Sequence, residues 1–179
     1  RLLRCNLVAN ELDDRVHTVR AAASMNSGTG QLVRSSSNSG DHRVRLTSRG
    51  DHSHADDGTI EVPLRRLDDL LAEHHIEIGD IGAVWIDSQG HEAHVLGGAP
   101  DLMRSSVPVI VEYWPYGLRL ADGLDLLHSL IAENFDLVID VRDADRDGKA
   151  RSFPARDVGQ LEQRYTDDSF TELILLTDH

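Results

Sequence analysis

Two short apolar runs separated by a helical pattern constrain this chain more than any other feature. The first run, Ala83–Ile86, is continuously apolar and stops at Asp87. The second, Val107–Val111, ends at Glu112. Apolar residues between the two runs recur at the three-to-four-residue spacing of a helix, whereas the runs themselves are typical of buried strands. This order predicts a βαβ unit, whose two parallel strands end at the same edge of a sheet.

The acidic residues that end these strands are the first candidates for chemistry. Ligands of open α/β sheets bind along the edge where the parallel strands end. We therefore expect Asp87 and Glu112 to lie in a functional site. Two plainer interpretations stay open, because Asp is also a favoured helix N-cap and Glu112 could be an edge acid satisfied by its neighbours.

The rest of the chain continues the alternation of strands and helices. No linker divides it, so the pattern predicts one α/β domain over residues 1–179, with a β-rich insertion at residues 28–63. Expected helices are 3–12, 67–75 and 121–134; expected strands are 16–23, 31–34, 42–46, 59–63, 135–141 and 173–176; and 48–58 is an expected loop.

Composition excludes several classes of partner. The chain has 31 acidic and 18 basic residues, a net charge of −13, which disfavours nucleic acid and anionic membranes. Cys5 is the single cysteine, so an intrachain disulfide and a cysteine-based zinc site are excluded. No apolar run reaches the roughly 18 residues of a membrane span, and no signal peptide is visible. These features predict a cytoplasmic location without a membrane partner, and they leave the oligomeric state open.

The central stretch resembles one known family. Its similarity lies in Trp85–Glu92 (Trp-Ile-Asp-Ser-Gln-Gly-His-Glu), Val95–Ala99, Pro108 and Glu112–Gly117. These residues resemble the FkbM-type S-adenosylmethionine-dependent methyltransferases. Ala21–Ser24 near the N-terminus fits the same family. The resemblance implies a Rossmann-like methyltransferase fold, with a doubly wound and mostly parallel sheet.

The function that this resemblance implies is methyl transfer from S-adenosylmethionine to a hydroxyl group of a small molecule or sugar. The family's first strand ends in an acidic, glycine-rich loop that holds the cofactor, and no such loop occurs in this sequence. We therefore expect a partial domain that lacks the first two strands of the fold. A non-catalytic methyltransferase-like binding module is the alternative. A third possibility is a metal-dependent hydrolase that uses Asp87, Glu92 and Glu112.

The resemblance also suggests roles for particular residues. A hydroxyl acceptor must lose a proton, and His has an unperturbed pKa near neutrality. Other interpretations remain: His91 could be a surface residue, Glu92 could complement the helix dipole, and the two alanines could simply allow tight packing. The expected roles are catalytic for Asp87, His91 and Glu112; cofactor-binding for Ala21, Ala22 and Asp87; and substrate-binding for Gln89 and Glu92.

Two patterns that imitate metal sites are not interpreted as such. Asp143–Gly148 copies the first half of a calcium-binding loop, but the twelfth position is Pro154 rather than Glu. Asp51–Asp57 offers His and Asp side chains without a second half that could close a site. We expect a solvated turn and a loop, and no bound metal.

Overall fold

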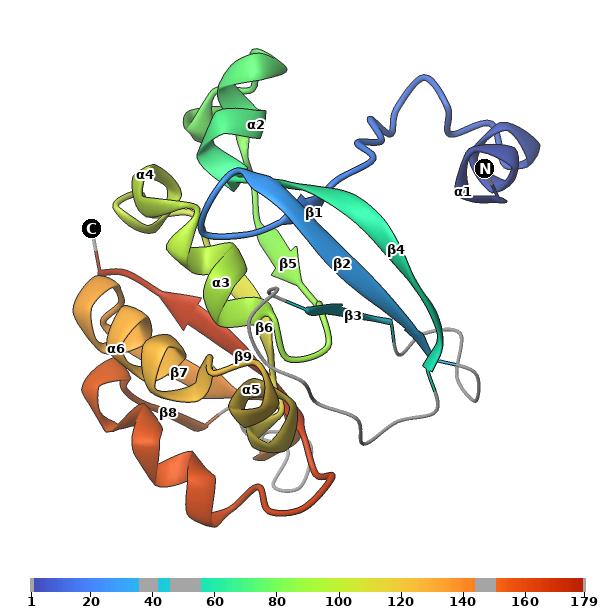
Figure 1. Cartoon of the computed structure of the whole chain (residues 1–179). Coiled ribbons are helices and arrows are strands. Elements are labelled where there is room, and N and C mark those ends of the chain that lie inside the picture. The colour runs from blue at the N-terminus through green and yellow to red at the C-terminus, as the bar shows by residue number, and fades with distance from the viewer. Residues whose placement is uncertain (1, 36–41, 46–55, 144–150, 179) are drawn as a thin grey trace.

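The computed structural model describes residues 2–35, 42–45, 56–143 and 151–178, and over these the chain is mixed α/β (Figure 1). The elements in chain order are α1 (Leu2–Ala9), β1 (Ala22–Ala23), β2 (Gly28–Ser35), β3 (Arg43–Arg45), β4 (Asp56–Arg65), α2 (Leu67–Glu73), η1 (Ile78–Asp80), β5 (Val84–Ile86), α3 (Glu92–Gly97), α4 (Pro100–Met103), β6 (Val109–Tyr113), α5 (Pro115–Leu120), α6 (Leu124–Asn134), β7 (Leu137–Asp140), β8 (Arg151–Pro154), η2 (Ala155–Gln163) and β9 (Thr171–Leu176).

A five-stranded sheet, which we call the large sheet, carries the predicted βαβ unit. Its strand order is β5-β6-β9-β7-β8, and β5 pairs with β6 in parallel, with Ile86 opposite Val111. The parallel pair is confirmed. The large sheet as a whole is mixed, because β9 enters between β6 and β7 in antiparallel orientation and β8 returns as an antiparallel neighbour of β7. Since β5, β6 and β7 still run in one direction, their carboxyl ends share one edge.

The predicted β-rich insertion forms a second sheet, which we call the small sheet, with strand order β1-β4-β2-β3. Two local expectations fail here. The strand expected over residues 16–23 is reduced to Ala22–Ala23, because Val16 and Val19 stay 42% and 44% exposed and gain no burial from alternation. Residues 56–58, expected to be loop, belong to β4, while residues 48–55 lie outside the described part.

The core lies on one face of the large sheet. Alternation along β6 buries Val109, Val111 and Tyr113 completely, and α3, α6 and η2 cover this face (Figure 1). Leu127 and Ile131 of α6 are also fully buried against it. Burial of such aliphatic side chains stabilises a fold by about 1.5–3 kcal/mol each. The helices therefore fix how the strand ends are presented.

The α-helical predictions are mostly confirmed, with one split and one addition, and the short 3-10 helix η1 and the longer η2 were not expected either. The helices expected at 67–75 and 121–134 appear as α2 and α6. The single helix expected between the two central strands is instead α3 followed by α4, because Pro100 occupies the first turn of α4 and cannot continue a preceding helix. Pro115 likewise begins α5, which was not expected.

The small sheet docks onto α3 through a close approach between backbones. A Cβ atom at Gly98 would lie 2.2 Å from the carbonyl oxygen of Ser24, which follows β1. The Gly98 carbonyl also accepts a hydrogen bond from the Asp68 amide of α2, at 3.2 Å. Only glycine allows this approach at position 98. The end of β1 is thereby held beside α3.

Candidate active site

Asp87 and Glu112 lie side by side at the carboxyl edge of the large sheet. Ile86 of β5 pairs with Val111 of β6, and Asp87 and Glu112 are the residues that follow these two. The two carboxylates therefore lie at the same height along neighbouring strands. Asp87 is exposed and Glu112 is partly exposed. The N-cap residue of α3 is His91, so the alternative interpretation of Asp87 as that cap is wrong.

Gln89 joins the two carboxylates. Its side-chain Nε2 donates a hydrogen bond of 2.8 Å to Asp87 Oδ1 and a longer one of 3.5 Å to Glu112 Oε2. The sequence placed these three residues in one site, and the structure brings them together. An accessible pair of carboxylates with an amide between them can accept hydrogen bonds from, and orient, a ligand that carries hydroxyl groups.

Glu92 lies beneath this group and is fully buried. Its Oε1 accepts hydrogen bonds from the Ser88 amide (2.8 Å), the Ser88 hydroxyl (3.1 Å) and the Gly90 amide (3.1 Å). Burial raises the pKa of the Glu92 carboxyl, while the backbone hydrogen bonds act in the opposite direction. The structure thus places Glu92 under the turn that follows β5, away from the exposed edge.

His91 is also interior, with 1% of its surface exposed. Its Nε2 lies 3.1 Å from the hydroxyl oxygen of Ser24, and its ring centroid lies 4.6 Å from that of His94. His94 is oriented by donating its Nε2 proton to the Ala121 carbonyl at 2.8 Å. Burial, and then the neighbouring His94, lower the pKa of His91 to about 4. His91 is therefore a neutral ring at neutral pH, and the interpretation as a surface residue is wrong.

The two alanines expected at the cofactor lie at the start of the small sheet. Ala21 and Ala22 are partly buried, and Ala22 pairs with Leu64 of β4. The contact between Ser24 and His91 brings the end of this strand to the first turn of α3. The alanines and Asp87 therefore both adjoin the start of α3, although they are far apart in the sequence.

Residues after β6 pack closely against the turn that follows β5, and no role was predicted for them from the sequence. A Cβ at Gly90 would lie 2.5 Å from the Gly117 carbonyl oxygen, and one at Gly117 would lie 2.1 Å from the Trp114 ring. The guanidinium of Arg43 from β3 lies 4.7 Å from the centre of the same ring. The sequence signal was the Trp-Pro-Tyr-Gly string itself, in which Gly117 follows Trp114 by three residues.

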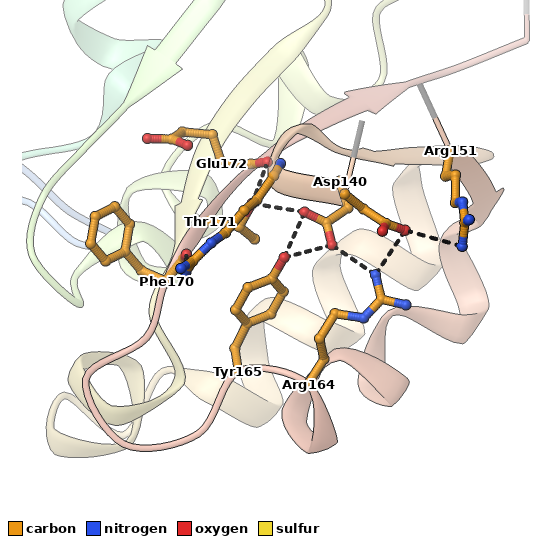
Figure 2. Close-up of polar contacts among 9 residues, drawn as sticks. Asp140, Arg151, Arg164, Tyr165, Phe170, Thr171 and Glu172 are labelled. Atoms are coloured by element: carbon orange, nitrogen blue, oxygen red, sulfur yellow. Dashed lines mark hydrogen bonds and ion pairs between the residues drawn. The ribbon is translucent and has the colours of Figure 1, made fainter. Parts of the chain in front are cut away.

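A second polar cluster lies at the same sheet edge, at the end of β7 (Figure 2). Asp140 is 1% exposed and accepts hydrogen bonds from the Tyr165 hydroxyl (2.7 and 2.8 Å) and the Thr171 hydroxyl (2.7 Å). Arg164 bridges Asp140 (3.1 Å) and Asp143 (3.0 Å). Because this carboxylate is buried and well supplied with donors, it joins β7, η2 and β9 rather than facing a ligand. No pattern in the sequence predicted this cluster.

Neither metal chemistry nor a membrane span finds support in the described residues. No group of three or more His, Cys, Asp or Glu side chains there is placed to hold a metal ion, so the carboxylates of the hydrolase alternative are not gathered into such a site. Within the same ranges, no helix has the length and apolar character needed to cross a bilayer. The loop-like patterns at Asp51–Asp57 and Asp143–Gly148 fall largely outside those ranges.

Comparison with known proteins gives a family and one curated relative. The methyltransferase FkbM domain matches residues 1–130. The 2-O-methyltransferase NoeI of Sinorhizobium fredii is 36% identical over 78 residues, which cover 41% of this chain and 31% of that protein. The matched segment thus spans about a third of that curated relative. No solved structure matches the chain, so the Rossmann-like fold stays a prediction.

Proposed function

Since the chain belongs to the FkbM methyltransferase family, we propose that the protein transfers a methyl group from S-adenosylmethionine to a hydroxyl oxygen of a small molecule or sugar. The observation that carries the proposal is the pair of carboxylates, Asp87 and Glu112, which Gln89 joins at the carboxyl edge of the parallel strands. The printed name of the relative, a 2-O-methyltransferase, supports an oxygen acceptor.

Asp87, Gln89 and Glu112, at the carboxyl edge of the large sheet, suit the part of a methyltransferase site that binds the methyl acceptor. One of the two carboxylates accepts a hydrogen bond from the acceptor hydroxyl and then its proton, which leaves the oxygen lone pair available for the new bond to carbon. The other carboxylate and the Gln89 amide hold neighbouring polar groups of the acceptor. Fixing the acceptor in this way is proximity catalysis. His91 is buried, so it is less suited than Asp87 or Glu112 to take the proton directly.

The fit to the cofactor is partial. Carboxylates suit a cationic sulfonium, and the small side chains of Ala21 and Ala22 leave room for a flat ring such as adenine. S-adenosylmethionine, when bound, would supply a methyl carbon already activated by its positive sulfur. The 179 residues contain no glycine-rich loop after a strand to hold the remainder of that molecule. The net charge of −13 favours a small-molecule partner over nucleic acid.

The test is Asp87→Asn, assayed by transfer of a radiolabelled methyl group from S-adenosylmethionine to a panel of sugars and other hydroxyl acceptors. Asn keeps the oxygen that accepts from Gln89 and removes only the charge, so the fold should be unchanged. We expect turnover to fall by roughly 10²-fold or more, the low end for a positioned acid or base. Asp80→Asn, at an exposed position of η1, is the matched control.

Two outcomes would count against this proposal. Unchanged turnover in Asp87→Asn, with an unchanged melting temperature, would remove Asp87 from the site. A wild-type protein that binds a sugar in calorimetry but transfers no label to any acceptor would favour the binding module.

A further inference from the structure

Glu92 holds both ends of the turn that follows β5. One oxygen of its buried carboxyl group accepts all three hydrogen bonds, two from Ser88 and one from the Gly90 amide, at 2.8–3.1 Å. Three donors on one oxygen fix the path of the backbone between these residues. Ser88 and Gly90 therefore keep their places only while an acceptor occupies the position of Glu92 Oε1.

The residue between them is held in an unfavourable conformation. Gln89 has a φ of 55°, in the left-handed region, which is unfavourable for a residue other than glycine. Gly90, at φ 95°, lies so close to Gly117 that a Cβ atom at position 90 would be 2.5 Å from the Gly117 carbonyl oxygen. The turn is thus supported by the Glu92 carboxyl group and by the backbone of Gly117. Without that support, Gln89 would relax towards an ordinary backbone conformation.

This conformation determines where the Gln89 side chain lies. From it, Nε2 reaches Asp87 Oδ1 at 2.8 Å and Glu112 Oε2 at 3.5 Å. Rotation of the Gln89 backbone out of the left-handed region would carry the amide away from both oxygens. The arrangement of the two carboxylates therefore depends on Glu92, although Glu92 itself is fully buried.

We propose that Glu92 is a positioning residue, which holds the Ser88–Gly90 turn and through it keeps Gln89 between Asp87 and Glu112. This role replaces the substrate-binding role expected from the sequence. Burial raises the pKa of Glu92, which favours the neutral form, and a neutral acceptor serves the three donors as well. The kinetic part of the inference rests on the proposed methyl transfer, whereas the structural part does not.

The experiment compares Glu92→Ala with Glu92→Gln in the purified protein. Ala removes the acceptor, whereas Gln retains an oxygen at the same reach without a charge. Two readouts report on the turn without any substrate: the side-chain amide signals of Gln89 in nitrogen-edited NMR, and the hydrogen-exchange rate of the Gly90 amide. A third readout is the steady-state kinetics of methyl transfer. Glu133→Ala, at an exposed position of α6, is the control.

We expect Glu92→Ala to shift the Gln89 amide signals and to raise the Gly90 exchange rate by roughly tenfold or more. Turnover should fall by about 10²-fold, as for misplacement of reacting groups, with little change in KM. Glu92→Gln should restore all three readouts. If Glu92→Ala does not fold, Glu92→Asp, whose carboxylate is shorter by one methylene, should show the same shifts.

Each of three results would overturn the structural or the kinetic part of the proposal. Gln89 signals that are unchanged in a folded Glu92→Ala or Glu92→Asp would show that Glu92 does not hold the turn. If Glu92→Gln is as impaired as Glu92→Ala, and if the impairment is a raised KM rather than a lowered turnover, the charge of Glu92 would be assigned to substrate binding. Moved Gln89 signals with unchanged turnover would make the turn irrelevant to catalysis. Lack of methyl transfer in the wild type would contradict the proposed function, while the NMR and exchange comparison would still decide whether Glu92 holds the turn.

Discussion

His91 makes the stability of the protein depend on pH. The ring is buried between the Ser24 hydroxyl and the His94 ring, and its pKa is lowered to about 4 from 6.5. Because the unfolded chain binds a proton near pH 6.5 and the folded one only near pH 4, the stability present above pH 6.5 is lost as the pH falls through this window. Over the whole window the loss amounts to roughly 3 kcal/mol.

We therefore expect His91→Gln to flatten the pH dependence of the free energy of unfolding between pH 7.5 and 4. Urea denaturation of both proteins across this range is the measurement. Burial also lowers the pKa of His128, but His128 is present in both proteins and cancels in the difference. Parallel curves for wild type and variant would show that His91 titrates normally in the folded state.

At the scale of elements, the Asp140 cluster joins three segments that are distant in the sequence. Tyr165 follows η2 and donates its hydroxyl proton to the buried carboxylate at the end of β7, and Thr171 does so from β9 (Figure 2). A hydrogen bond to a charged group contributes about 1.5–3 kcal/mol. The cluster thus stabilises the far end of the edge on which Asp87 and Glu112 lie.

Tyr165→Phe should lower the free energy of unfolding by roughly 1–3 kcal/mol, because the buried Asp140 loses one donor and gains none. Tyr116→Phe, at a residue that is 36% exposed, should change it by about 0.5 kcal/mol or less. Urea denaturation of the two variants makes the comparison. Equal effects would mean that the hydroxyl of Tyr165 adds nothing to stability.

At the scale of the whole molecule, the two sheets are held together through adjacent glycines at the end of α3. A Cβ at Gly98 would meet the backbone of Ser24 at 2.2 Å, whereas a Cβ at Gly97 would meet only the end of the Met25 side chain, at 2.7 Å. A backbone carbonyl cannot move without moving the small sheet, but a methionine methyl group can rotate away.

Gly98→Ala should therefore destabilise the protein by about 1–3 kcal/mol, as overpacking does, and should increase hydrogen exchange in β2 and β4 of the small sheet. Gly97→Ala is the matched control and should have a smaller effect on both quantities. Similar effects of the two substitutions would contradict docking through this backbone contact.

The sequence predicted those features of the fold that depend on local periodicity. The apolar runs before Asp87 and Glu112 predicted two parallel strands with a common edge, and the side chains that lie together there include Gln89 from the intervening turn. The helical spacing of 67–75 and 121–134 likewise predicted α2 and α6. The isolated alternation of 16–23 failed as a predictor, because Val16 and Val19 remain exposed and pair with none of the strands in the described part of the chain.

Only the tertiary structure decided how deeply the polar side chains are buried and which groups they contact. Periodicity reports which face of an element is apolar, but it does not report what packs against a His or a Glu. His91 is buried by Ser24, 67 residues earlier in the chain, and Asp140 is satisfied by donors 24–31 residues later. Glu92 interacts locally, yet its complete burial depends on the packing of α3 against α6 and the large sheet. Contacts of this kind arise only when distant segments fold together, so the sequence alone determined which strand ends share an edge but not the arrangement that supports them.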